Sequence, residues 1–243
     1  MRRKYNGALA PKKEIVEIFK SAQTIYEEKY GSSNENAEID ITARWERDNP
    51  NKSKEEYEKF YESERDVAEE LIHWHKRRSY FRANRPMTAA SIAKDYGCKT
   101  FCEFGTGIGC DGVSIAYQGF TPIWGVDINK YCLEITEALY RKYGFSPIIK
   151  DSREMDFENM EPVDMLYSSD VLEHLIDVEG TLDKWINKFR VVIVYAPFGI
   201  NDVQKQHTDY PAKSLHKFMD RKGYEKVVYK LGIPPFVYVR KDQ

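Results

Sequence analysis

The chain has 243 residues, of which 42% are hydrophobic and 31% charged, so it can bury a sizeable core beneath a charged surface. Its formal net charge of −2 excludes a global field that attracts nucleic acid or anionic membranes. No apolar run approaches the roughly 18 residues that span a bilayer. The four cysteines lack C-x-x-C spacing and the basic N-terminus lacks an apolar signal segment, so we expect reduced thiols and a cytoplasmic protein.

Residues 1–96 are predicted to form a helical extension. Apolar residues recur at helical spacing over residues 14–30, and a long helix is predicted over residues 53–85. Ser53 and Glu56 have the spacing of a capping box at its start, and Pro86 is expected to end it. A short helix over residues 88–96 follows.

The predicted long helix carries acidic residues early and basic residues late. A substrate-binding interpretation makes the basic, aromatic stretch over residues 73–82 a patch for an anionic substrate. The simpler interpretation is a solvated helix face whose charges complement the helix dipole, and we favour it. The basic residues concerned are Lys76, Arg77, Arg78, Arg82 and Arg85.

From residue 100 onward, strands alternate with helices, which is typical of a parallel sheet covered by helices on both faces. The predicted strands span residues 100–104, 123–126, 147–149, 163–167 and 191–195. Two further strands, over residues 224–231 and 236–239, are separated by a Gly232-Ile233-Pro234-Pro235 turn and predict a terminal β-hairpin.

The first of these strands runs into a glycine-rich turn, G-T-G-I-G, over residues 105–109. Glycines at alternate positions permit positive φ angles and let bare backbone amides approach a ligand. Residues 107–112 also satisfy the G-x-G-x-x-G dinucleotide fingerprint, and Asp127 at the end of the next strand could bind the ribose of either cofactor. This stretch alone therefore leaves S-adenosylmethionine (SAM) and NAD open.

Three features favour SAM. The run E-x-G-x-G-x-G from Glu103 to Gly109 resembles motif I of the class I SAM-dependent methyltransferases. The run D-V-L-E-H over residues 170–174 resembles the D/E-x-L-E-H segment after the fourth strand in many small-molecule methyltransferases. The terminal hairpin fits that family, whereas an NAD domain continues to a sixth parallel strand. The resemblance implies an α/β, Rossmann-like, seven-stranded, mostly parallel sheet over residues 97–243, preceded by a helical lid over residues 1–96. The lid side chains expected nearest to the substrate are Tyr57, Tyr61, Trp74 and Tyr80.

The resemblance also implies which residues contact SAM. The glycine backbone would pass under the methionine and ribose, with Glu103 near the amino group. Asp127 would accept hydrogen bonds from both ribose hydroxyls, and Asp151 would accept one from the adenine amino group. Ser169 and Asp170 would lie on the methionine side. The implied set is Glu103, Gly105, Gly107, Gly109, Asp127, Ile128, Asp151, Ser152, Ser169 and Asp170.

Three residues are candidates for general base and substrate orientation, namely His174, Asp170 and His207, which follow adjacent strands. A metal is the alternative that we favour less. The D/E-x-x-E-H pattern with a distant histidine resembles the ligand set of the ubiquinone-pathway O-methyltransferases and the small-RNA 3′-end 2′-O-methyltransferases. The ligands would then be Asp170, Glu173, His174 and His207. An aspartate stands where glutamate is more usual, and L-E-H is common without metal.

The aromatic content of 14%, with 17 tyrosines, suits a small organic acceptor. The chain lacks the N/D-P-P-Y/F and Pro-Cys motifs of DNA base methylation. We therefore predict a SAM-dependent methyltransferase that acts on an oxygen or nitrogen of a small molecule, without nucleic-acid or membrane partners. The alternatives are a metal-assisted RNA 2′-O-methyltransferase and a non-catalytic SAM-binding partner subunit. The acceptor, its pathway and the oligomeric state stay open.

Overall fold

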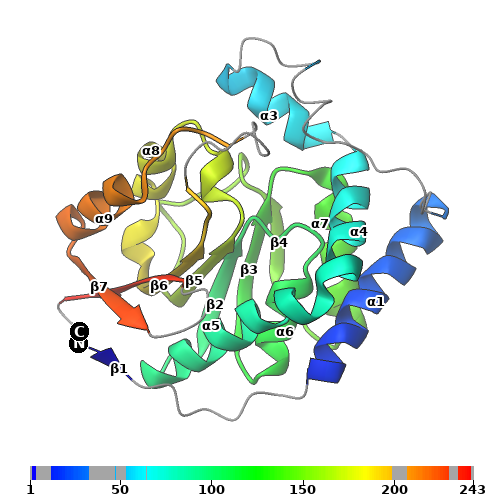
Figure 1. The fold of residues 1–243 in the computed structure, drawn as a ribbon, viewed down its shortest axis with the longest axis horizontal. Coiled ribbons are helices and arrows are strands. Elements are labelled where there is room, and N and C mark those ends of the chain that lie inside the picture. Colours follow the sequence, from blue (N-terminus) through cyan, green and yellow to red (C-terminus); the bar gives the residue numbers. More distant parts are fainter. Residues whose placement is uncertain are drawn as a thin grey trace.

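A mostly parallel β-sheet forms the centre of the molecule (Figure 1). The computed structural model describes residues 2–3, 12–32, 47, 53–63, 65–198, 207–229 and 235–241. The strands are β1 (Arg2–Arg3), β2 (Thr100–Phe104), β3 (Thr121–Asp127), β4 (Ile148–Asp151), β5 (Val163–Ser169), β6 (Phe189–Tyr195), β7 (Tyr224–Tyr229) and β8 (Phe236–Arg240).

The strand order is β1-β7-β8-β6-β5-β2-β3-β4. Strand β8 runs antiparallel to both β6 and β7, and the other described pairings are parallel. Strands β2 to β8 therefore confirm the predicted seven-stranded sheet with its terminal hairpin, and the short β1 adds to one edge. Residues 232–234 of the predicted hairpin turn, and the last two residues of the strand predicted before it, lie outside the described residues.

The described helices are α1 (Lys12–Tyr30), α3 (Lys54–Ser63), α4 (Arg65–Arg82), α5 (Asn84–Asp95), α6 (Cys110–Tyr117), α7 (Lys130–Lys142), α8 (Val178–Asp183) and α9 (Ala212–Arg221). Two short 3₁₀ helices are η1 (Leu172–His174) and η2 (Ile186–Lys188). The predicted capping box at the start of α3 is confirmed. The Glu56 amide donates to Ser53 Oγ at 3.2 Å, and the Ser53 amide donates to Glu56 Oε2 at 3.1 Å.

The single helix predicted over residues 53–85 is wrong. This region contains α3, α4 and the start of α5, and Pro86 lies in the first turn of α5 instead of ending a helix. A proline is tolerated there because the amide of a first-turn residue has no partner within its own helix. The sequence pattern does not distinguish a proline in the first turn of a helix from a proline that follows a helix, because in both cases the proline stands next to apolar residues at helical spacing.

Helices α1 and α4–α7 cover one face of the sheet, and α8 and α9 cover the other (Figure 1). Ile18 of α1 and Ile72 of α4 belong to the same buried cluster as Phe101 of β2 and Ile193 of β6. The N-terminal helices therefore share a core with the sheet, and the predicted boundary at residue 96 does not separate a lid from a domain. Removing residues 1–85 would uncover the surfaces of α6 and α7 against which α1 packs.

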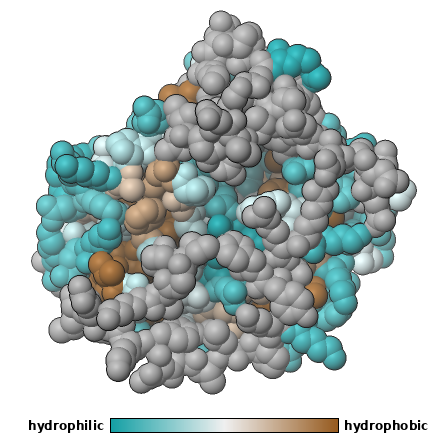
Figure 2. Space-filling model, viewed as in Figure 1, coloured by the Kyte–Doolittle hydropathy of each residue, from teal (hydrophilic) through white to brown (hydrophobic). Residues whose placement is uncertain are grey.

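Hydrophilic residues cover much of the visible rim in Figure 2, and a group of hydrophobic residues is seen in the region of β6 and β7. Few large hydrophobic side chains among the described residues are exposed, namely Tyr117, Ile148, Ile176 and Val228. Within the same part of the chain, no helix has the length and apolar character needed to cross a membrane. All four cysteines are buried free thiols.

Candidate functional site at the carboxyl edge of the sheet

The predicted site residues follow the carboxyl ends of neighbouring parallel strands. Strands β2, β3, β4 and β5 end at Phe104, Asp127, Asp151 and Ser169. In the sheet register, Asp127 pairs with Asp151, and Phe104 pairs with Ser168 one residue before the end of β5. The structure thus brings these strand ends to one edge, where open α/β sheets bind ligands.

The glycine turn adopts the backbone geometry that the sequence predicts. Gly105, Gly107 and Gly109 have φ angles of 75°, 50° and 76°, in the left-handed region that favours glycine. A Cβ atom at position 105 would lie 2.0 Å from Val171 Cγ2. The first glycine therefore also lets the segment after β5 pack directly against the turn.

Asp127 holds the glycine turn through its carboxylate. Oδ2 accepts a hydrogen bond from the Gly107 amide at 2.7 Å, and Oδ1 accepts from the amides of Ile128 at 2.8 Å and Asn129 at 2.9 Å. Burial raises the pKa of Asp127, and these amides counteract that effect. A carboxylate has about four acceptor sites. At least one site is therefore left for a ligand, and the expected hydrogen bonds from the two ribose hydroxyls stay a prediction.

Glu103 turns away from the glycine turn. Its side chain is buried, and Tyr140 donates a hydrogen bond to Oε2 at 3.4 Å. A Cβ atom at position 112 would lie 2.1 Å from the same oxygen, so Gly112 lets the carboxyl group lie against α6. Burial, followed by the charge of Asp111, raises the pKa of Glu103 well above its ordinary value. This position does not support the expected contact between Glu103 and a cofactor amino group.

The end of β4 is tied to α3 through an arginine. Arg153 donates to Asp151 Oδ1 at 2.9 Å and also pairs with Asp151 Oδ2, while its Nη1 atom lies 2.8 Å from Glu62 of α3. Two other predicted cofactor residues lie nearby: the Ser152 amide donates to the Asp127 carbonyl at 2.8 Å, and the Ile128 side chain is half-buried. Asp151 therefore already has an ionic partner, and its expected contact with adenine has to share that carboxylate.

Buried Arg82 and half-buried Arg85 determine the state of the Asp170 carboxylate. Arg82 and Arg85 both pair with its Oδ2 atom, and Arg85 donates to Ser169 Oγ at 2.9 Å. Burial alone would raise the pKa of Asp170, but the two guanidinium groups outweigh it and hold the pKa below its ordinary value. A carboxylate with these partners is a poor general base, so the structure does not support that role for Asp170.

The same contacts correct the interpretation of the basic run. Arg82 is 4% exposed, its guanidinium stacks 4.4 Å above the Trp74 ring, and its Nη2 atom lies 3.9 Å from Asp111 Oδ2. Arg82 and Arg85 are therefore not part of a solvated helix face. Asp170 itself has a φ angle of 55°, the only positive value among non-glycine residues in the described part of the chain. This turn directs its carboxylate toward the arginines.

Glu173, His174 and His207 form a compact cluster beyond β5 and β6. One potential ligand atom from each residue lies within 4.8 Å of the other two. The ring centroids of His174 and His207 lie 4.8 Å apart. The Thr208 amide donates a hydrogen bond to the Glu173 carbonyl at 2.7 Å, which joins the two segments that carry the cluster. Three of the four residues named as metal ligands thus come together, whereas Asp170 points to the arginines.

The donors in this cluster fit a divalent metal ion. Glu173 is 0% exposed, and neither of its carboxylate oxygens has a hydrogen-bond partner among the described residues. Burial, followed by the charge of Asp170, raises its pKa well above the ordinary value. A buried carboxyl group without partners is costly unless another group, such as a metal ion, satisfies it. Two imidazoles and one carboxylate are ligands for divalent transition metals.

Tyr61 of α3, one of the residues expected near the substrate, contacts this cluster. Its hydroxyl lies 3.1 Å from His174 Nδ1. Trp74 instead packs under Arg82, and the side chains of Tyr57 and Tyr80 lie outside the described residues. Sequence reasoning missed Arg82 and Arg85 as partners of Asp170. Their only signal was an acid-free basic run, which does not identify a partner distant in sequence.

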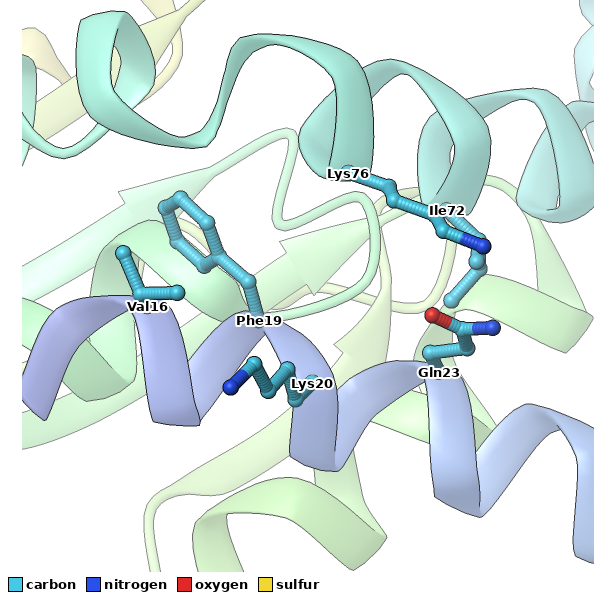
Figure 3. Close-up of a pocket in the computed structure, with 6 residues that line it drawn as sticks. All are labelled: Val16, Phe19, Lys20, Gln23, Ile72 and Lys76. Carbon is cyan, nitrogen blue, oxygen red and sulfur yellow. The ribbon is translucent and has the colours of Figure 1, made fainter. Parts of the chain in front are cut away.

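A separate hollow lies between α1 and α4 (Figure 3). None of the predicted site residues lines it, so it is not the candidate site. Its lining combines apolar side chains with two amines and one amide, from Val16, Phe19, Lys20, Gln23, Ile72 and Lys76.

Comparisons with known proteins agree with this fold. Magnesium protoporphyrin IX methyltransferase (ChlM) from Synechocystis PCC 6803 with bound SAH has a TM-score of 0.52 at 15% identity, over 65% of this chain and 83% of that chain. The structure of the same enzyme with bound SAM also has a TM-score of 0.52 at 15% identity, and this match covers 97% of this chain and 99% of that chain. At this identity the likeness shows the fold alone. No curated protein matches the sequence significantly. The family model described as "Methyltransferase domain" matches residues 63–229, more than half of the chain. The chain therefore belongs to this methyltransferase-domain family.

Proposed function

We propose that this protein transfers a methyl group from SAM to an oxygen atom of a small-molecule acceptor, with a divalent metal ion held by Glu173, His174 and His207. The observation that carries the proposal is the buried carboxyl group of Glu173, which has no hydrogen-bond partner in the described part of the chain. It lies beside two histidines, at the same sheet edge as the glycine turn. The family match and the bound SAM of the structural neighbour support the choice of cofactor.

The proposed reaction is a single displacement. The bond between the methyl carbon and the sulfonium breaks as the new carbon–oxygen bond forms, and the sulfur keeps the electron pair. Because the sulfonium already activates the methyl group, the protein mainly aligns the acceptor and excludes water. The glycine turn and Asp127 would hold the cofactor beside Gly105, and the acceptor would approach from the side of Glu173.

An acceptor hydroxyl must also lose its proton. His174 and His207 are the basic groups of the cluster, and either would receive the proton directly if no metal takes part. Glu173, His174 and His207 would hold a divalent ion, and such an ion, when bound, lowers the pKa of a hydroxyl that it contacts. Asp170 is left out of this chemistry because two arginines hold its carboxylate.

RNA methylation at a 2′-hydroxyl would use the same chemistry. The feature that favoured it was the basic run after residue 75. Arg82 and Arg85 of that run are largely buried and paired with Asp170, so they do not form a surface for phosphates. We therefore retain a small molecule, with neighbouring oxygen atoms that a metal ion can chelate, as the acceptor.

The cofactor is tested by binding. We expect calorimetry to detect SAM and S-adenosylhomocysteine but not NADH. Asp127→Asn should weaken the binding of S-adenosylhomocysteine by about 2 kcal/mol, because an amide cannot replace the charge-assisted hydrogen bonds of the carboxylate. Asp156→Asn, in an exposed turn, is the matched control and should leave the affinity unchanged. Binding of NADH without binding of SAM would contradict the cofactor assignment.

The metal is tested by its removal. Incubation of metabolite extracts with methyl-labelled SAM should give labelled products, and treatment of the protein with EDTA should abolish the transfer. Mn²⁺, Mg²⁺, Zn²⁺ or Fe²⁺ is then added back singly, and one of them should restore it. Full turnover by a protein shown to be free of metal would contradict the metal site and would leave His174 or His207 as the base.

A further inference from the structure

Helix α3 contacts both halves of the candidate site through Tyr61. The Tyr61 carbonyl accepts a hydrogen bond from Asn129 Nδ2 at 2.7 Å, and the Tyr61 hydroxyl lies 3.1 Å from His174 Nδ1. Asn129 is the N-cap of α7, where its Oδ1 atom accepts from the Cys132 amide at 2.9 Å. The backbone amide of Asn129 donates to Asp127 Oδ1. Tyr61 is therefore linked to the proposed ribose-binding carboxylate through Asn129 by two consecutive hydrogen bonds.

The next residue provides a second, independent contact of α3 with the same edge. Glu62 pairs with Arg153, which in turn holds Asp151 at the end of β4. The backbone carbonyl of Tyr61 and the carboxylate of Glu62 thus both dock α3. The Tyr61 hydroxyl makes a further contact that is not needed for docking, with the imidazole of His174 in the proposed metal site.

We infer that Tyr61 is a positioning residue whose hydroxyl orients the His174 ring for metal binding and links it to the cofactor side of the site. This inference rests on the proposed function. An imidazole has two nitrogens, and the one that binds a metal is selected by the hydrogen bond that the other makes. With Nδ1–H donating to the Tyr61 hydroxyl, Nε2 keeps the lone pair that a metal ion requires. The tilted contact of the two rings, 5.4 Å between centroids, further restricts rotation of the imidazole.

The linkage gives α3 a specific role in the reaction. The backbone carbonyl of Tyr61, through Asn129, contacts the residues proposed to hold the cofactor. The hydroxyl of Tyr61 contacts the residues proposed to hold the acceptor. Tyr61 therefore fixes the separation between methyl donor and metal-bound acceptor, which an in-line displacement requires to be accurate.

Two variants of the full-length protein separate this role from docking. Tyr61→Phe removes only the hydroxyl and keeps both the ring and the carbonyl that binds Asn129. Glu62→Gln weakens the docking of α3 but leaves the contact with His174. The readouts are titration of the metal-free protein with Co²⁺, followed by visible absorption, calorimetry with S-adenosylhomocysteine, and thermal unfolding.

For Tyr61→Phe we expect Co²⁺ affinity to fall by about 10- to 100-fold, the usual effect of losing an outer-shell partner of a metal-binding histidine. Affinity for S-adenosylhomocysteine should not change, and Glu62→Gln should keep the Co²⁺ affinity of the wild type. Unchanged Co²⁺ affinity in Tyr61→Phe, with a wild type that binds Co²⁺, would overturn the role of Tyr61 alone. An equal loss in both variants would show that the hydroxyl acts only through docking. A wild type that binds no Co²⁺ would overturn the proposed metal site and this role together.

Discussion

Arg82→Met should lower the free energy of unfolding by about 3–5 kcal/mol, the range for removing one partner of a buried ion pair. The guanidinium group of Arg82 pairs with Asp170, lies 3.9 Å from Asp111 and is almost inaccessible to water. Methionine keeps much of the hydrophobic stem of Arg82, so the loss reports on the guanidinium group more than on the packing of the stem. Urea unfolding followed by circular dichroism measures the difference.

Arg221→Met is the matched control for this experiment. Arg221 pairs with Glu179 through side chains that are 59% and 37% exposed, and a surface pair of this kind contributes at most about 1 kcal/mol. Equal losses in the two variants would show that the buried pairs of Arg82 are not what stabilises the fold. Because Asp170 lies between β5 and η1, Arg82→Met should also displace the segment that bears Glu173 and His174.

Glu173→Leu should change metal binding and stability in opposite directions. The variant loses a ligand, so turnover should fall by more than the roughly 100-fold that loss of an outer-shell partner costs. The metal-free variant should be more stable than metal-free wild type by about 1–3 kcal/mol. The reason is that an apolar side chain replaces a buried carboxyl group that has no hydrogen bond to any described residue. Metal analysis and urea unfolding, both after EDTA treatment, measure the two effects.

Glu225→Leu, at an exposed position of β7, is the control for a change from glutamate to leucine. It should keep both metal content and turnover. A Glu173→Leu protein that still binds one metal ion with the affinity of the wild type would remove Glu173 from the ligand set. A lower stability of the metal-free variant would show that the carboxyl group has a structural role which outweighs its burial.

The amino-acid sequence by itself determined the features that depend on local pattern. Alternating glycines at residues 105, 107 and 109 predicted a turn with positive φ, and all three angles are positive. The capping box of Ser53 and Glu56, the strand–helix alternation after residue 100 and the terminal hairpin also appear as predicted. Each of these is encoded by residues within a few positions of one another, where backbone preference and hydrophobic period act directly.

Only the tertiary structure decided which charged groups meet. Arg82 and Asp170 are 88 residues apart in sequence, and no local pattern identifies them as partners. The docking of α4 and α5 places Arg82 and Arg85, from a basic run that resembled a solvated face, against Asp170. These pairs remove Asp170 from the candidate bases and metal ligands. Glu103 likewise turns inward because Gly112 leaves space for its carboxyl group. Electrostatic partners follow from how elements dock, and docking depends on the whole core, so the spacing of residues within one element does not determine them.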